Sequence, residues 1–348
     1  MLLFAILAVF LGKCCVTSLT YKGVDWSSTL VEESGGQTYI GLDGKEKPLE
    51  RIFKNNGVNI VRQRIWNTDG DYGLEYNLQL AQRAQAQGLK IYLDFHLSST
   101  WADPSHQDRP AEWQDYGIDE LAAAVQSYTQ STMNSFQDPG VLLEMVSIGN
   151  EITMGLLWPV GDMDESPYNV ATLLRAASAG IKASNMRPTP RIMIHLDNGW
   201  NWDTQQWWYD TILEQGPLAS SDFDIQGVSY YPFYNEDATI ALLTSSLTNM
   251  IARYGKEVMV VETDWPTDCP DPLYEFPSDT QDIAISVAGQ AEWISDVAEA
   301  VEAAGGTGLF YWEPAWIGNA GLGSSCANNL MFDRSGQAED SVKAFRSI

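Results

Sequence analysis

Eight short apolar segments alternate with amphipathic segments along almost the whole chain, and this alternation constrains the fold more than any other feature of the sequence. Most of them are rich in β-branched or aromatic residues, as expected for strands that are covered on both faces. The predicted strands are Lys22–Asp25, Asn59–Trp66, Leu89–His96, Leu142–Gly149, Arg191–Leu196, Ile225–Tyr231, Glu257–Val261 and Gly308–Trp312.

The intervening segments carry apolar residues at helical spacing. Leu74–Gln87 has an apolar stripe that includes Leu78, Ala81 and Ala84, and Gly88 is suited to cap its carboxyl end. Glycines also stand one to four residues before predicted strands, where a β/α unit turns back; these are Gly57, Gly88, Gly140 and Gly305. The other predicted helices are Ile118–Phe136, Val170–Ala183, Trp207–Leu213, Thr239–Tyr254 and Ala288–Ala304.

Strand and helix patterns that alternate in this way predict an α/β fold, a single (β/α)₈ TIM barrel over residues 19–348. The main alternative is a doubly wound sheet. That fold is disfavoured because no Gly-x-Gly-x-x-Gly motif follows the first predicted strand. We find no composition break and no Pro- or Ser-rich linker, so one catalytic domain is the simplest organisation.

Residues 1–18 have the features of a secretory signal peptide. Leu2–Leu11 is apolar but too short to span a bilayer, and Val16–Ser18 offers a cleavage point that leaves Leu19 first. We therefore expect a secreted, extracellular protein. Cleavage removes two of the four cysteines and leaves Cys269 and Cys326, an even pair that predicts a disulfide in an oxidising compartment. The alternative is two free thiols.

The formal net charge of −26 over 348 residues argues against nucleic acid or an anionic membrane as a partner, and such strong like charge favours a monomer. No later apolar run approaches the length of a membrane span. The 13 Trp and 15 Tyr residues permit a carbohydrate ligand, because aromatic faces pack on sugar rings, although core filling explains most of them equally well.

Polar and aromatic residues crowd the carboxyl ends of the predicted strands, which is where function gathers in a barrel of this kind. A barrel without a functional site would not be expected to show this arrangement at seven strand ends. The residues are Arg62, Arg64, Trp66, Asp94, His96, Trp101, Asp103, Asn150, Glu151, His195, Asp197, Asn198, Trp200, Tyr230, Tyr231, Glu262, Asp264, Trp265, Trp312 and Glu313.

Glu151 and Glu262 are the most informative members of this set. Each follows an apolar strand, where an ionised carboxylate is costly unless something uses it. We predict that the two face each other across one pocket and together cleave a glycosidic bond. The alternative is that either one is the partner in a structural ion pair inside the barrel.

Several motifs carry a resemblance to a known family. Ser147–Glu151 together with Val260–Thr263 resembles the retaining β-glycosidases that have Glu at the ends of strands 4 and 7. The fuller set of motifs resembles the fungal arabinogalactan endo-β-1,4-galactanases, glycoside hydrolase family 53, over essentially the whole chain after Leu19. The chain departs from the family pattern at Asp264 and Asn198. The motifs that carry the closer resemblance are Asn59–Trp66, Asp94–Pro104, Glu151–Pro159, Tyr230–Tyr234 and Tyr311–Trp316.

The resemblance implies a retaining endo-β-1,4-galactanase. Glu262 is then the nucleophile and Glu151 the proton donor and base, with their carboxyl groups about 5–5.5 Å apart. Arg62 is expected to supply the countercharge of Glu262, Asn150 to bind the sugar 2-hydroxyl, and Tyr230 to donate a hydrogen bond to Glu262.

Further residues at the strand ends are expected to bind or orient the substrate, with the first two as platforms for sugar rings: Trp101, Trp312, His96 and Asp197. His195 is expected to be a structural imidazole. No cofactor and no metal are expected, because acids such as Asp268, Asp271 and Asp333 lack a regular calcium loop and the family resemblance implies no required metal.

Two other functions remain compatible with the sequence. A related barrel hydrolase, such as a β-mannanase or a cellulase, would share both glutamates but have a different groove. A carbohydrate-binding protein without activity would use the same scaffold, although the presence of both Glu151 and Glu262 argues against it.

Overall fold

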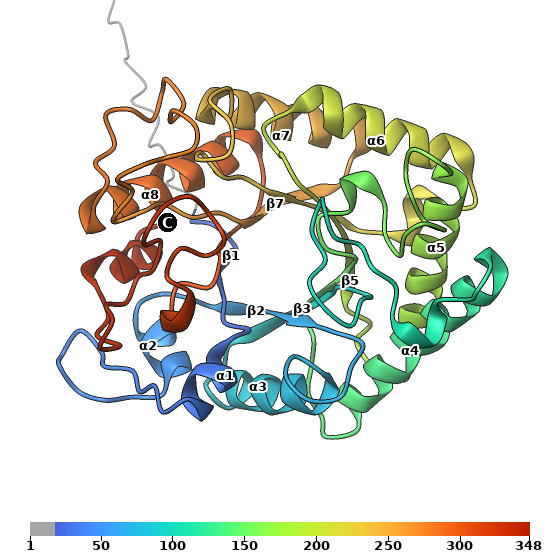
Figure 1. Ribbon diagram of the computed structural model, residues 1–348, viewed down its shortest axis with the longest axis horizontal. Helices are drawn as coiled ribbons and strands as arrows, with labels where there is room; N and C mark the ends of the chain where they lie inside the picture. The colour runs from blue at the N-terminus through green and yellow to red at the C-terminus, as the bar shows by residue number, and fades with distance from the viewer. Residues whose placement is uncertain (1–17) are drawn as a thin grey trace, which may run out of the picture.

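The computed structural model describes residues 18–348, and their strands close into one parallel barrel (Figure 1). Neighbouring strands pair in chain order, and β1 closes the barrel on β8 with Tyr21 opposite Gly308. The prediction of a (β/α)₈ barrel is confirmed. The predicted signal peptide lies outside the described residues except for Ser18. The strands are β1 Tyr21–Asp25, β2 Ile60–Ile65, β3 Lys90–Phe95, β4 Met145–Ile148, β5 Arg191–Leu196, β6 Ile225–Ser229, β7 Glu257–Glu262 and β8 Gly308–Tyr311.

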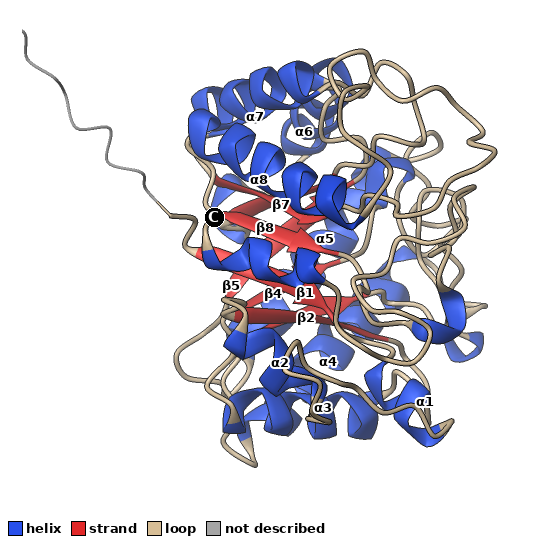
Figure 2. Ribbon diagram, turned by 90° about the vertical axis from the view of Figure 1, so that its left-hand side faces the viewer, coloured by secondary structure: helices blue, strands red, loops and turns tan. Residues whose placement is uncertain are grey.

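Helices surround the barrel, and long loops gather at one end of it (Figures 1 and 2). The six helices predicted from apolar spacing are all present, with ends shifted by a few residues. Two short helices between β1 and β2 were not predicted. The helices are α1 Thr29–Ser34, α2 Leu49–Asn55, α3 Leu74–Ala86, α4 Ile118–Gln137, α5 Pro167–Ala183, α6 Trp202–Gln215, α7 Ile240–Tyr254 and α8 Val287–Ala304.

The glycines that precede strands make the expected turns. All four have positive φ angles, a conformation that is strained for residues with a side chain; they are Gly57, Gly88, Gly140 and Gly305. At Gly57 space is limiting as well, because a Cβ atom would lie 2.4 Å from the carbonyl oxygen of Phe345. The turn therefore brings the start of β2 close to the carboxyl-terminal segment.

The apolar core has two layers. The outer layer lies between the strands and the helices, and the inner layer fills the barrel itself. Large inner side chains fit because glycines face them: a Cβ atom on Gly23 would lie 2.1 Å from the ring of Phe310, and one on Gly227 would lie 2.4 Å from the sulfur of Met193. The inner layer consists of Tyr21, Ile60, Tyr92, Met145, Met193, Ile225, Met259, Val261 and Phe310.

Cys269 and Cys326 form a disulfide, as predicted, and join the loop after β7 to the loop after β8. The two cysteines are 57 residues apart, and closing a loop of that length stabilises the fold by about 4 kcal/mol in the chain-entropy description. Within residues 18–348 no helix is both long enough and apolar enough to cross a membrane.

The packing of Gly23 against Phe310 predicts that Gly23→Ala lowers the free energy of unfolding by about 1–3 kcal/mol, because the added methyl group overpacks the barrel interior. Phe310→Leu makes room for that methyl group. Denaturant unfolding of both single variants and the double variant should show that the double variant loses less stability than the sum of the two. Additive losses would contradict the proposed contact.

Candidate active site

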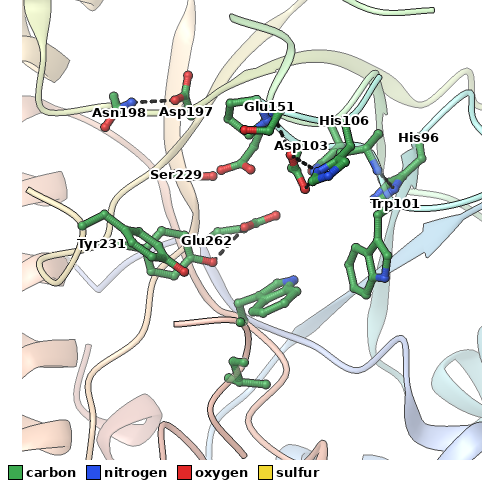
Figure 3. Close-up of a pocket in the computed structure, with 18 of the residues that line it drawn as sticks. His96, Trp101, Asp103, His106, Glu151, Asp197, Asn198, Ser229, Tyr231 and Glu262 are labelled. Atoms are coloured by element: carbon green, nitrogen blue, oxygen red, sulfur yellow. Dashed lines mark hydrogen bonds and ion pairs between the residues drawn. The ribbon is translucent and has the colours of Figure 1, made fainter. Parts of the chain in front are cut away.

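A cavity of about 680 Å³ opens at the carboxyl ends of the strands, where the polar residues were predicted to gather. Residues in or after β2 through β8 line it, and Glu151, Ser229 and Glu262 project into it from three different strand ends (Figure 3). The lining residues include Arg62, His96, Trp101, Asp103, His106, Asn150, Glu151, Asp197, Asn198, Ser229, Tyr231, Tyr234, Glu262, Trp312 and Trp316.

Arg62 is the cation of this site. Its guanidinium is 1% exposed and contacts carboxylate oxygens of Asp25, Asp94 and Glu262, each at 2.7 Å. It also donates to Oδ1 of Asn150 at 2.7 Å. Burial alone would lower the pKa of Arg62, but the surrounding carboxylates outweigh this and raise it well above the usual value. The guanidinium therefore stays charged.

Glu262 has two partners that stabilise its ionised form, although burial outweighs them. Burial raises the pKa of Glu262 to about 7, against the opposing effects of Arg62 and of the hydrogen bond from Tyr231. The Tyr231 hydroxyl donates to Oε2 of Glu262 at 2.8 Å, while Arg62 contacts Oε1. Each carboxylate oxygen thus has its own donor.

Glu151 has the opposite environment. It lies at a left-handed backbone position, φ 48°, directly after β4 and Asn150. Burial, then the nearby Glu262 and Asp197 carboxylates, raise the pKa of Glu151 well above its usual value, and a hydrogen bond from Ser229 acts against them. No cation contacts Glu151 among the ion pairs of residues 18–348. As the pH rises, Glu262 therefore loses its proton before Glu151 does.

The two buried histidines are neutral. Burial lowers the pKa of His195 to about 3 and also lowers that of His96. Nδ1 of His96 accepts hydrogen bonds from Trp66 and from the Ala102 amide, each at 3.1 Å, so the proton sits on Nε2, which faces Asp94 at 3.3 Å. Nε2 of His195 lies 2.8 Å from the Ser229 hydroxyl, so this imidazole supports the residue that contacts Glu151.

Asn150 and Asp197 both reach the cavity with part of their polar groups already engaged. Asn150 Nδ2 donates to the carbonyl oxygen of Ala102 at 2.7 Å. Asp197 accepts from Asn198 Nδ2 at 2.5 Å and from the hydroxyl of Thr153. These contacts fix the orientation of both side chains before any ligand binds.

Three indole rings form one aromatic platform in the cavity wall, and we define it as Trp101, Trp312 and Trp316. Trp101 and Trp316 are stacked, with ring centroids 5.9 Å apart and planes 20° apart. Trp312 meets Trp101 edge-on at 6.1 Å. Two of these residues were predicted as sugar platforms, and Trp316 was not.

The predicted hydrogen bond from Tyr230 to Glu262 is wrong. Tyr230 is buried outside the cavity and donates to the carbonyl oxygen of Ala238 at 2.8 Å, while Tyr231 contacts Glu262. The physical reason is strand alternation. Ile225 lies in the barrel interior, so the odd-numbered positions of β6 face inward, and this parity continues through Ser229 to Tyr231.

The sequence did not single out several lining residues. Ser229 could have been found from the same alternation along β6. His106, Tyr234 and Trp316 lie in loops, where no period relates position to direction. Of the two departures from the family pattern, Asn198 lines the cavity, whereas Asp264 is fully buried and is not among the lining residues. Among residues 18–348 no group of three or more His, Cys, Asp or Glu is placed to hold a metal.

A parallel barrel that holds two carboxyl groups in unequal environments at the ends of β4 and β7, beside half-buried indole rings, has the site of a glycoside hydrolase. Comparison with known proteins agrees. The family described as "Glycosyl hydrolase family 53" matches residues 21–345, and the chain belongs to this family.

Its relatives are similar over almost their whole length. The "Arabinogalactan endo-beta-1,4-galactanase" of Humicola insolens is 56% identical over 95% of this chain and 100% of its own, and that of Thermothelomyces thermophilus is 54% identical over the same shares. A solved structure from a study of two fungal beta-1,4-galactanases superposes with a TM-score of 0.93 at 56% identity, covering 95% of this chain and 100% of that one. The family resemblance predicted from the motifs is confirmed.

The contacts of the two tyrosines predict a clear difference between two matched variants. Tyr231→Phe removes a hydrogen bond that lowers the pKa of Glu262, so the pKa rises. In the nucleophile role that we propose below, Glu262 acts as an anion, so the acid limb of the pH profile of kcat/KM should move by about one unit to higher pH.

Tyr230→Phe is the control, because it removes the same hydroxyl without touching Glu262. It should cost about 1 kcal/mol of stability and leave the acid limb in place. Equal shifts of the acid limb in both variants would disprove the assignment of Tyr231.

Proposed function

We propose that this chain is a secreted, retaining endo-β-1,4-galactanase that hydrolyses β-1,4-galactosidic bonds in the galactan side chains of type I arabinogalactan, a component of pectin. Family membership and the names of its relatives support this substrate. The acidic surface is compatible with it, because a net charge of −26 repels a polyanionic backbone but not a neutral galactan.

The unequal environment of the two carboxyl groups carries the mechanistic part of the proposal. Glu262 has Arg62 and Tyr231 to stabilise its negative charge, whereas Glu151 pairs with no cation of residues 18–348 and lies near other carboxylates. When the pair carries a single proton, the proton resides on Glu151. This is the distribution that a retaining glycosidase requires in its resting state.

In the first step Glu151 donates its proton to the glycosidic oxygen as the bond from that oxygen to the anomeric carbon breaks. A Glu262 carboxylate oxygen forms a bond to the same carbon and gives a covalent glycosyl-enzyme. In the second step the Glu151 carboxylate takes a proton from water, whose oxygen attacks the anomeric carbon and displaces Glu262. Both glutamates return to their starting states, and the product keeps the β configuration.

Other residues of the cavity support these steps. Asn150 Nδ2 has two hydrogens, and one of them bonds Ala102, so the other serves the sugar 2-hydroxyl, where a hydrogen bond strengthens in the transition state. Ser229 holds the Glu151 carboxyl from the end of β6, and the aromatic platform offers apolar faces to the sugar rings. We propose that the enzyme acts as a monomer, since its charge disfavours self-association.

The substrate assignment predicts that purified protein releases short β-1,4-linked galacto-oligosaccharides from neutral galactan. Product analysis by chromatography at early times should show several lengths at once, because an endo-acting enzyme cuts within the chain. Mannan and xylan are the controls and should give no products. Activity on either of these controls, without activity on galactan, would replace the proposal by a related barrel hydrolase.

The roles of the two glutamates predict different products in the presence of azide. Each single variant, Glu151→Ala and Glu262→Ala, should lose at least about 10³-fold in kcat on galactan, because each removes an essential group. With an aryl β-galactobioside, whose leaving group needs no acid, azide should rescue Glu151→Ala and give the β-glycosyl azide. It should rescue Glu262→Ala by direct displacement and give the α-glycosyl azide.

Nuclear magnetic resonance distinguishes the two azides. The opposite pattern would exchange the roles of Glu151 and Glu262. A protein that binds galacto-oligosaccharides but shows full tolerance of Glu262→Ala would be a carbohydrate-binding protein without activity.

A further inference from the structure

A second buried ion pair lies beside the active site and takes no part in the chemistry described above. Arg64 of β2 and Glu313, which follows β8, are 1% and 2% exposed, and Nη1 of Arg64 contacts Oε1 of Glu313 at 2.5 Å. Neither side chain is among the described residues that line the cavity. Burying two charges is costly, so the pair needs a structural reason to be present at this position.

Two members of the aromatic platform contact Arg64. The Cζ atom of Arg64 lies 4.5 Å from the ring centroid of Trp101 and 5.2 Å from that of Trp316, the two stacked members of the platform. The ring of Tyr72 also packs on the guanidinium, with its centroid 4.3 Å from the Cζ atom of Arg64. The attraction between a desolvated guanidinium and these aromatic rings joins Trp101 and Trp316, which belong to different loops.

Glu313 fixes the segment that carries the other two indoles. It lies between Trp312 and Trp316 in the chain and adopts a left-handed backbone conformation, φ 44°, which a glutamate keeps only where its contacts hold it. Its Oε1 accepts from the amide of Ser28 at 2.9 Å and from the Ser28 hydroxyl at 2.7 Å, in addition to Arg64. The carboxylate therefore anchors the loop after β8 to the loop after β1.

We propose that Arg64 and Glu313 are positioning residues that hold Trp101, Trp312 and Trp316 in the arrangement that binds the galactan chain. This proposal rests on the proposed function, because it assumes that the platform binds sugar units. The ion pair touches no substrate. It sets the distance and tilt between indoles that come from the loops after β3 and β8, and so it determines how strongly a long chain is held.

Binding without turnover tests this proposal. In a Glu262→Ala background, which binds but does not cleave, the affinity for β-1,4-linked galactohexaose and galactobiose is measured by calorimetry. The test variant is Arg64→Met combined with Glu313→Gln, which leaves no unpaired buried charge. We expect it to weaken hexaose binding by about tenfold or more, as the loss of one desolvated cation–π contact implies.

Galactobiose should be affected less than about threefold, because a short ligand leaves part of the platform unused. Arg83→Met is the matched control. Arg83 pairs with Glu33 and Glu50, lies 5.8 Å from the Trp26 ring and does not line the cavity, so its loss removes a similar contact outside the platform and should leave both affinities unchanged. Near-ultraviolet circular dichroism of the test variant should change where stacked indoles absorb, and that of the control should not.

An unchanged hexaose affinity, or equal weakening for both ligands, would overturn the proposal. If the double variant does not fold, Arg64→Lys decides, because lysine keeps the charge but not the planar contact with the rings. It should weaken hexaose binding by at least about threefold, and unchanged affinity again overturns the proposal. If the Glu262→Ala background itself binds neither ligand, the proposed galactanase function fails instead.

Discussion

One buried guanidinium organises the centre of this protein. Arg62 joins Asp25 of β1, Asp94 of β3, Asn150 after β4 and Glu262 of β7, so a single side chain connects strand ends around the barrel. A buried cation is tolerated only with partners of opposite charge, and here it has more carboxylates than it can neutralise. The surplus of negative charge is what the remaining groups of the site must accommodate.

That surplus separates the two glutamates. Glu262 receives the cation and the Tyr231 hydroxyl, whereas Glu151 receives a hydrogen bond from Ser229 and the repulsion of nearby carboxylates. The same type of side chain therefore has a stabilised negative charge at the end of β7 and a disfavoured one after β4. The asymmetry originates in which strands carry Arg62 and Tyr231, not in any property of the glutamates themselves.

The sequence predicted those features that follow from periodicity. The apolar strand segments and the glycines before them identified the barrel, and its topology placed Glu151 and Glu262 in one cavity. Strand alternation could have separated Tyr231 from Tyr230, but the prediction followed the family resemblance and named the wrong residue. Trp316 could not be predicted, because it belongs to a loop whose course depends on the long-range contact of Glu313 with the start of the chain.

The filled interior of the barrel has a consequence for how a polymer approaches. Phe310 occupies the space that Gly23 leaves, and the surrounding rings and thioethers close the central axis. A polysaccharide cannot thread through the protein, so sugar units reach the cavity and leave it on the same side of the barrel.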